Sequence, residues 1–173
     1  DGVFKHITEL SFSGNTIGDE GARHIATAIT AGALPRLREL YLGRNEIGDA
    51  GLERLLPALA TIPLERFNLS HNKISDVGAV ALAMTAATEE ASPPFDRLRE
   101  VWLSGGRINE KGVQALTYAL QNGALPAIEE LTLTSNPCSA KTMLAFQQQM
   151  DARKAGMTVV VSLEQLAKQF HNE

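Results

Sequence analysis

Short alternating segments of apolar and polar residues recur along this chain, and each is followed by a longer segment with helical spacing. The clearest copy lies in residues 37–59, where Leu40 and Leu42 alternate with Glu39 and Tyr41. Alternation with a period of two predicts a short strand that buries its leucines and exposes the residues between them. We therefore expect a strand that covers residues 39–43.

The segment after each strand predicts a helix. Gly51, Leu55 and Leu59 are four residues apart, which places them on one helix face. The same slots in other copies hold Gly21, Ile25 and Ile29; Gly78, Leu82 and Ala86; and Gly112, Leu116 and Leu120. An acidic residue stands at each helix start: Asp19, Asp49, Asp76 and Glu110. We expect these carboxylates to cap free N–H groups there, and the glycines to let each helix lie close to its strand.

The strand and helix together form a repeat unit that occurs five times in the sequence. Its short motif reads Leu-x-x-Leu-x-Leu-x-x-Asn-x-Ile and appears as ITELSFSGNTI, LRELYLGRNEI, LERFNLSHNKI, LREVWLSGGRI and IEELTLTSNPC, one copy every 27 to 34 residues. A period in this range predicts a solenoid. We place the repeats at about residues 4–33, 34–60, 61–94, 95–124 and 125–155, within a single domain that covers residues 1–173.

An asparagine closes the short motif in four of the five copies: Asn15, Asn45, Asn72 and Asn136. Gly106 takes this position in the fourth copy. The sharp turn from strand to helix leaves backbone groups unpaired inside the solenoid, and an amide side chain can donate to them and accept from them. We therefore expect the stacked asparagines to form a ladder.

The motif LxxLxLxxN followed by xIxxxG and a full helix resembles the ribonuclease-inhibitor-type leucine-rich repeats, over about residues 4–155. The resemblance implies an α/β leucine-rich-repeat solenoid, curved, with parallel strands on the concave face and helices on the convex face. It is specific for the fold and carries no particular activity.

Three regions depart from the repeat. Residues 156–173 predict a C-terminal cap made of a strand and a short helix. Residues 87–96 form an insertion, ATEEASPPFD, for which a tolerated loop is favoured over a contact site. At the N-terminal side only Val3 and Phe4 are available to cover the first strand, so we expect a missing segment or a partner to cover this open edge. The chain is accordingly expected to be a fragment or subunit of something larger.

Composition narrows the function classes. Hydrophobic residues make up 44% of the chain and charged residues 21%, with a net charge of -4, which argues against a general nucleic-acid or anionic-membrane binder. A single cysteine excludes an internal disulfide and fits a reducing compartment. No run approaches eighteen apolar residues, so no membrane span is predicted. We expect an intracellular, cytoplasmic location; an organellar one remains open if a targeting peptide has been removed.

The chain lacks the motifs of common catalytic and metal sites. No HExxH, CxxC, GxxxxGK[ST] or GxSxG pattern is present, and the histidines are scattered. Cys138 replaces the buried isoleucine of the other repeats, so we interpret it as a small core residue. No catalytic residue, metal or cofactor is therefore expected.

The exposed strand positions form the candidate binding surface. The only tryptophan, Trp102, and one of two tyrosines, Tyr41, share a column on either side of Asn68, at an expected separation of about 10 Å. Exposed Trp and Tyr beside charges are typical of interaction hot spots, although Trp is also common in ordinary strands. The full set of candidate residues is Tyr41, Trp102, Asn68, Glu39, Arg66, Glu100, Glu130, Arg44 and His71.

These features favour a non-enzymatic protein–protein interaction module or assembly subunit that binds a partner through its concave face. The acidic column that Arg66 interrupts suggests a partner with a basic segment. Two alternatives stay open. Five repeats plus a terminal helix resemble the cytoskeletal cap domain of tropomodulins, which implies actin binding. The Ran GTPase-activating protein uses this repeat type, which implies regulation of a small GTPase.

Overall fold

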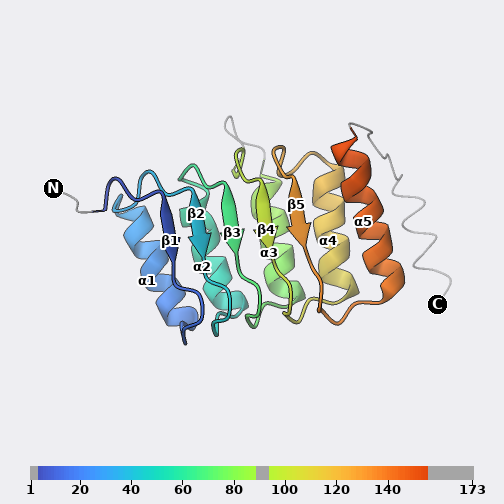
Figure 1. The fold of residues 1–173 in the computed structure, drawn as a ribbon, viewed down its shortest axis with the longest axis horizontal. Helices are drawn as coiled ribbons and strands as arrows, with labels where there is room; N and C mark the ends of the chain where they lie inside the picture. Colours follow the sequence, from blue (N-terminus) through green and yellow to red (C-terminus); the bar gives the residue numbers. More distant parts are fainter. Residues whose placement is uncertain (1–3, 89–93, 156–173) are drawn as a thin grey trace.

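The described part of the chain folds as five strand–helix units, and these units lie in a single row (Figure 1). The computed structural model describes residues 4–88 and 94–155. Within these ranges the elements are β1 (Glu9–Ser11), α1 (Asp19–Thr30), β2 (Glu39–Tyr41), α2 (Asp49–Leu59), β3 (Arg66–Asn68), α3 (Asp76–Ala86), β4 (Glu100–Trp102), α4 (Glu110–Gln121), β5 (Glu130–Thr132) and α5 (Ala140–Lys154). The strands are parallel in chain order. All helices lie on one side of the sheet, which confirms the predicted leucine-rich-repeat solenoid. We call the sheet side that these helices leave free the concave face.

The core lies between the sheet and the helices. Leu40 and Leu42 are fully buried, as the alternation predicted, and Leu55 and Leu59 meet them from α2. One unit alone could not bury its apolar face, so each unit depends on its neighbours for stability. The strand and helix periodicities therefore placed the core correctly.

The asparagine ladder is present and joins neighbouring repeats. Asn72 donates through Nδ2 to the carbonyls of Leu42 (2.8 Å) and Leu69 (2.9 Å), and its Oδ1 accepts from the N–H of Ile47 (3.0 Å). Asn45 and Asn136 make the equivalent bonds in their own repeats. Each amide therefore satisfies backbone groups of two repeats, which confirms the predicted role.

The ladder is interrupted at Gly106. Among the described residues the N–H of Ile74, which an asparagine in this slot would reach, has no acceptor. A Cβ on Gly106 would lie 2.9 Å from the carbonyl oxygen of Ile74 and 3.0 Å from Oδ1 of Asn136. A side chain at position 106 would therefore fit only if these neighbouring atoms moved.

The acidic residues at the helix starts do not cap their own helices, contrary to the prediction. Instead of capping its own helix, Asp49 reaches the start of α3, where Oδ1 accepts from the N–H groups of Ser75 (2.8 Å) and Gly78 (3.0 Å). Asp76 does the same for Asn109 and Gly112, and Asp19 for Gly48. The local caps are Gly18, Gly48, Ser75, Asn109 and Ser139. The carboxylates thus form a second ladder between repeats.

This second ladder explains the recurring glycine. A Cβ on Gly78 would lie 2.6 Å from Oδ1 of Asp49 and 2.9 Å from Cγ2 of Ile74. The prediction that glycine allows close packing is confirmed, but the close neighbour includes a carboxylate of the preceding repeat. At the last junction Thr142 holds the glycine slot of the fifth repeat. The longer Glu110 holds the aspartate slot of the fourth repeat and accepts from Ser139 N–H (2.7 Å).

The end of α5 is tied to the preceding unit by Arg153. Its guanidinium donates to the carbonyls of Leu120 (2.7 Å), Ala124 (3.2 Å) and Leu125 (2.9 Å). Burial lowers the pKa of this guanidinium. Arg153 thus caps the C-terminal end of α4 and the loop that follows it.

Replacing Arg153 by alanine is expected to lower the free energy of unfolding by about 1–2 kcal/mol, because three carbonyls lose a charged donor. Denaturant titration measures this loss, and hydrogen exchange should rise first in α5. Lys154→Ala is the matched control, since this exposed neighbour makes no such bonds among the described residues. Equal stability of both variants would contradict the capping role.

Two predicted segments lie wholly or partly outside the described residues. The C-terminal cap at 156–173 is one, and the centre of the 87–96 insertion, at 89–93, is the other. The end of the insertion is described, and Phe95 is buried there with φ of 61°. Phe95 O accepts from Leu98 N–H (3.1 Å), so the insertion returns to the core before β4.

Candidate functional site

The strand register assembles the columns that the sequence predicted on the concave face. The first column is Glu9, Glu39, Arg66, Glu100 and Glu130, and the second is Ser11, Tyr41, Asn68, Trp102 and Thr132. Seven of the nine candidate residues therefore lie on adjacent strands. The remaining two, Arg44 and His71, lie in the turns beyond the strand ends.

Tyr41 and Trp102 form one aromatic unit. Their ring centroids are 6.2 Å apart and the ring planes meet at 25°, so the rings stack. The strand spacing predicted a separation of about 10 Å between these two residues, and this prediction was wrong for their rings. The two side chains lean towards each other across the strand between them. Asn68 leaves that space free: its Oδ1 accepts from Ser70 N–H (2.9 Å), next to the side-chain-free Gly43.

The polar ends of both rings are held by carboxylates. The Tyr41 hydroxyl donates to Oε2 of Glu39 (2.6 Å), and Trp102 Nε1–H donates to Oε1 of Glu130 (3.0 Å). Burial, helped by the hydrogen bond to Glu39, raises the pKa of the Tyr41 phenol to about 12. Both rings are partly buried and fixed in orientation, which limits the entropy that they lose when a partner binds.

The Tyr41 phenol is expected to ionise with a midpoint near pH 12, compared with 10.0 for an unperturbed phenol. Because the folded state raises this pKa, the contribution of Tyr41 to stability is complete below pH 10 and is lost as the pH rises towards 12. The ultraviolet absorbance of phenolate, recorded for the wild type minus Tyr41→Phe, measures the midpoint. A midpoint near 10 would contradict the contact with Glu39.

Arg66 divides the acidic column by binding two of its members. Its guanidinium lies 2.7 Å from Oε1 of Glu39 through Nη1 and 3.0 Å from Oε1 of Glu100 through Nε. Hydrogen bonding and charge attraction, from Glu100 first, raise the pKa of Arg66. The column thus neutralises part of its own charge. Among the described residues, Glu9 and Glu130 have no basic partner.

A hollow lies at the starts of β4 and β5, next to the end of α5. Its volume is about 330 Å³, and it is lined by Glu100, Glu129, Glu130 and Lys154. Sequence analysis did not select Glu129 and Lys154. Glu129 directly precedes β5 and could have been found from the strand register, whereas Lys154 ends α5 and no pattern placed it near the strands.

In every repeat, one residue of the turn after the strand has a positive φ angle. Gly14, Arg44, His71, Gly105 and Ser135 all have positive φ, between 56° and 74°. Arg44 and His71 are exposed at this rim. The imidazole of His71 packs on Gly105, where a Cβ would clash with it. The structure does not bring these two residues into contact with the aromatic pair.

Hydroxyl groups that sequence analysis did not select lie beside the pair. Ser104 Oγ donates to Thr132 Oγ1 (3.2 Å) and accepts from Thr134 Oγ1 (2.9 Å). Their signal in the sequence is the recurrence of Ser or Thr at outward strand positions, which is common in strands. These hydroxyls give the β4–β5 side of the concave face further hydrogen-bonding groups.

Cys138 behaves as the predicted core residue. It packs against the core, and its thiol donates to the carbonyl of Ile108 (3.4 Å). Burial raises the pKa of this thiol to about 11, which keeps it neutral and unreactive near neutral pH. In residues 4–88 and 94–155, no three His, Cys, Asp or Glu side chains are grouped so that they could hold a metal ion. No helix among the described residues has both the length and the apolar composition that a membrane span requires.

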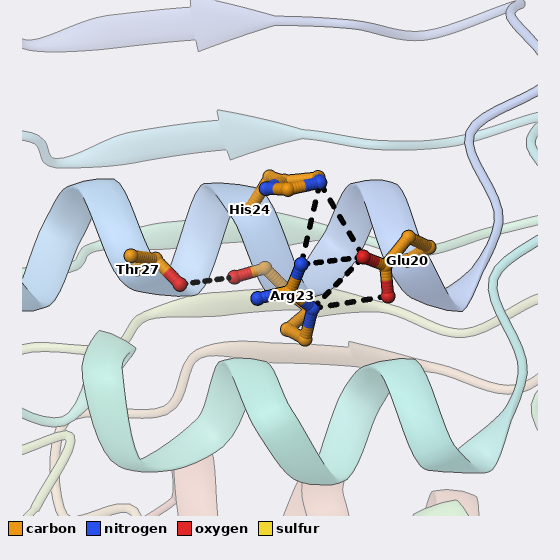
Figure 2. A network of polar contacts seen from close by, with 4 residues as sticks. All are labelled: Glu20, Arg23, His24 and Thr27. Carbon is orange, nitrogen blue, oxygen red and sulfur yellow. Dashed lines mark hydrogen bonds and ion pairs between the residues drawn. The ribbon is translucent and has the colours of Figure 1, made fainter.

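A polar network lies on the outer surface of α1, on the helix side of the molecule (Figure 2). Arg23 binds Glu20 (Nε to Oε1, 3.0 Å), and His24 Nε2 lies 3.4 Å from the same oxygen. The contact with Arg23 lowers the pKa of the Glu20 carboxyl. All three side chains are exposed, so we interpret the network as a solvated helix surface of small energetic weight.

Comparison with known proteins supports the fold. The family model described as Leucine Rich repeat matches residues 5–26, 34–56 and 62–83, in the first three units. Among solved structures, leiomodin-1 Actin-Binding Site 2 (ABS2) is similar with a TM-score of 0.62 and 13% identity, over 98% of this chain and 91% of that chain. At this identity the likeness shows the fold alone. No curated protein sequence matches the chain.

Proposed function

We propose that this leucine-rich-repeat solenoid is a non-enzymatic module that binds a partner protein on its concave face, at the Tyr41–Trp102 pair. The observation that carries this proposal is the stacked pair itself. Two aromatic rings from strands that are not adjacent meet on the sheet side without helices, and carboxylates hold both rings. Rigid Trp and Tyr side chains are favoured anchors of protein interfaces.

The charges around the pair favour a basic segment in the partner. Glu130 holds Trp102 and has no basic partner among the described residues. It also lines the 330 Å³ hollow, where three glutamates stand against one cation, Lys154. An arginine of the partner could stack on Trp102 and bind Glu130 with two hydrogen bonds. Because Arg66 already binds Glu39 and Glu100, we place the basic contact at the Glu130 side of the column.

Capture of binding proteins from the source lysate tests the concave face. We expect a Tyr41→Ala/Trp102→Ala variant to lose a protein that the wild type captures, as measured by quantitative mass spectrometry. For the identified partner, Trp102→Ala alone should weaken binding by about 10- to 100-fold, because truncation of an interface tryptophan removes a central anchor. Glu130→Gln should weaken it less, mainly at low salt.

The matched control is Tyr118→Ala, which removes an exposed tyrosine from α4 on the helix side. It should capture the partner as the wild type does. Loss of the partner by the Tyr118 variant alone would move the interface to the convex face. Retention of the partner by the Tyr41/Trp102 variant would overturn the proposed site and leave the interaction module intact.

Actin binding is a second candidate, because the fold resembles that of leiomodin-1 Actin-Binding Site 2. Co-sedimentation with actin filaments tests it directly. Pelleting of the wild type, and less pelleting of Trp102→Ala, would make actin the partner of the concave face. Absence of the wild type from the pellet would remove this candidate.

A further inference from the structure

The residues through which the second repeat binds the first repeat also occur at the same positions of the first repeat. The second unit contacts the first through Asn45, Gly48 and Gly51. The corresponding residues of the first unit are Asn15, Gly18 and Gly21, identical at all three positions. The first unit is therefore equipped, residue by residue, to receive another unit on its outer side.

The junction between the first two units shows what these groups bind. Asn45 Oδ1 accepts from Ile17 N–H (2.9 Å), and its Nδ2 donates to the carbonyl of Phe12 (2.9 Å). Gly48 N–H donates to Oδ1 of Asp19 (2.6 Å). The incoming unit thus supplies one N–H group, one carbonyl and one carboxylate, and the receiving unit supplies their complements.

The same groups are unused on the outer side of the first unit. Asn15 Nδ2 donates to carbonyls of its own unit, those of Phe12 (2.9 Å) and Ser13 (3.4 Å), and among the described residues its Oδ1 accepts no hydrogen bond. The N–H of Gly18, which corresponds to the Gly48 N–H, has no acceptor among the described residues. Strand β1 pairs along one edge, with β2, within the described sheet.

The apolar positions follow the same rule. Phe4 has the same position before its strand as Leu34, Phe95 and Leu125 have before theirs. The side chain of Phe4 is 53% exposed, whereas the other three are 6%, 4% and 2% exposed. Leu10 and Ile17 are partly buried, whereas their equivalents Leu40 and Ile47 are fully buried. Apolar surface and unused polar groups therefore coincide at one end.

The opposite end of the row lacks the groups that an incoming unit supplies. Ala140 stands at the start of α5, where the other units have Asp or Glu, so it offers no carboxylate. Cys138 N–H, at the position of Ile17, donates to Asn136 O (2.8 Å) within its own unit. A second copy of this chain that stacked its last described unit on the first could not reproduce the junction.

We propose that the outer surface of the first repeat, formed by Phe4, Leu10, Phe12, Asn15, Ile17 and Gly18, is a docking surface for one further leucine-rich repeat. The docked repeat places its strand parallel to β1. It donates an N–H group to Asn15 Oδ1, accepts from Asn15 Nδ2 and from Gly18 N–H, and carries an acidic residue at its helix start. Three internal junctions carry the asparagine contact and all four carry the carboxylate contact, and continuity with them specifies this occupant.

A tethered repeat tests the proposal. A copy of residues 4–33 is joined directly before Phe4, which reproduces the 30-residue spacing of the first native junction. We expect amide hydrogen exchange in residues 9–18 to slow by at least about 10-fold relative to the original chain, because β1 and the α1 start become internal. The fused protein should also unfold in one transition at a higher temperature.

Two controls separate docking from unspecific contact. Replacing the Asp19 equivalent by Ala in the added copy alone should reverse most of the protection near Gly18 and leave the rest of the chain unchanged. Unchanged exchange in residues 9–18 of the fusion would overturn the proposal. So would a concentration-dependent dimer of the original chain, by sedimentation, that Leu10→Asp abolishes, since a second copy would then be the occupant.

Discussion

Replacing Asn72 by alanine is expected to lower the free energy of unfolding by about 1–3 kcal/mol, the usual loss for a buried group left without its hydrogen bond. The variant leaves the N–H of Ile47 without an acceptor and removes one donor each from the carbonyls of Leu42 and Leu69. Asn72 is only 6% exposed, so water cannot easily replace these bonds. Equilibrium denaturant titration measures the loss.

Asn15→Ala is the matched control, because the same residue type in the same motif bonds only to its own unit and is exposed. We expect it to change the stability by less than about 0.5 kcal/mol. A loss as large as that of Asn72→Ala would contradict the argument that the ladder stabilises junctions between repeats. An unchanged stability of Asn72→Ala would contradict the ladder itself.

Gly78→Ala is expected to destabilise the fold by about 1–3 kcal/mol, although alanine normally favours a helix over glycine. The new methyl group would lie 2.6 Å from Oδ1 of Asp49, 2.9 Å from Cγ2 of Ile74 and 3.2 Å from Cδ2 of Leu52. Ile74 and Leu52 are buried, so they cannot move aside without loss of packing. Thermal unfolding of the variant measures the effect.

A double-mutant cycle identifies the carboxylate as the obstacle. Asp49→Ala removes the acceptor for Ser75 and Gly78 N–H and should destabilise the protein alone, but Gly78→Ala should then add less than it does in the wild type. Gly21→Ala is the control in the first unit, where the nearest atom is Cγ2 of the partly buried Ile17 at 2.7 Å. Strict additivity of the two changes would contradict the clash.

The concave columns were predictable because parallel strands with the same motif align by their repeat. Glu39 lies opposite Arg66 and Tyr41 opposite Asn68, as the aligned motifs required. The contacts within the columns were not predictable. The Tyr41–Trp102 stack depends on Asn68 bonding to Ser70 N–H, and the charge pattern depends on Arg66 reaching two glutamates at once. Side-chain rotamers decide both, and they respond to neighbours that are distant in the chain.

The repeat period, the alternation of Leu40 and Leu42 and the asparagine slots are local patterns, so the sequence by itself determined the solenoid, its core and the asparagine ladder. The destination of the acidic residues was decided only in the tertiary structure. Asp49 lies beside its own helix start in the chain, yet its carboxylate binds the start of α3. Stacking brings the next helix within reach, and the glycine at position 78 leaves room for the oxygen. Sequence proximity suggested a local cap, whereas packing between repeats places the N–H groups of Ser75 and Gly78 within hydrogen-bonding distance of the carboxylate.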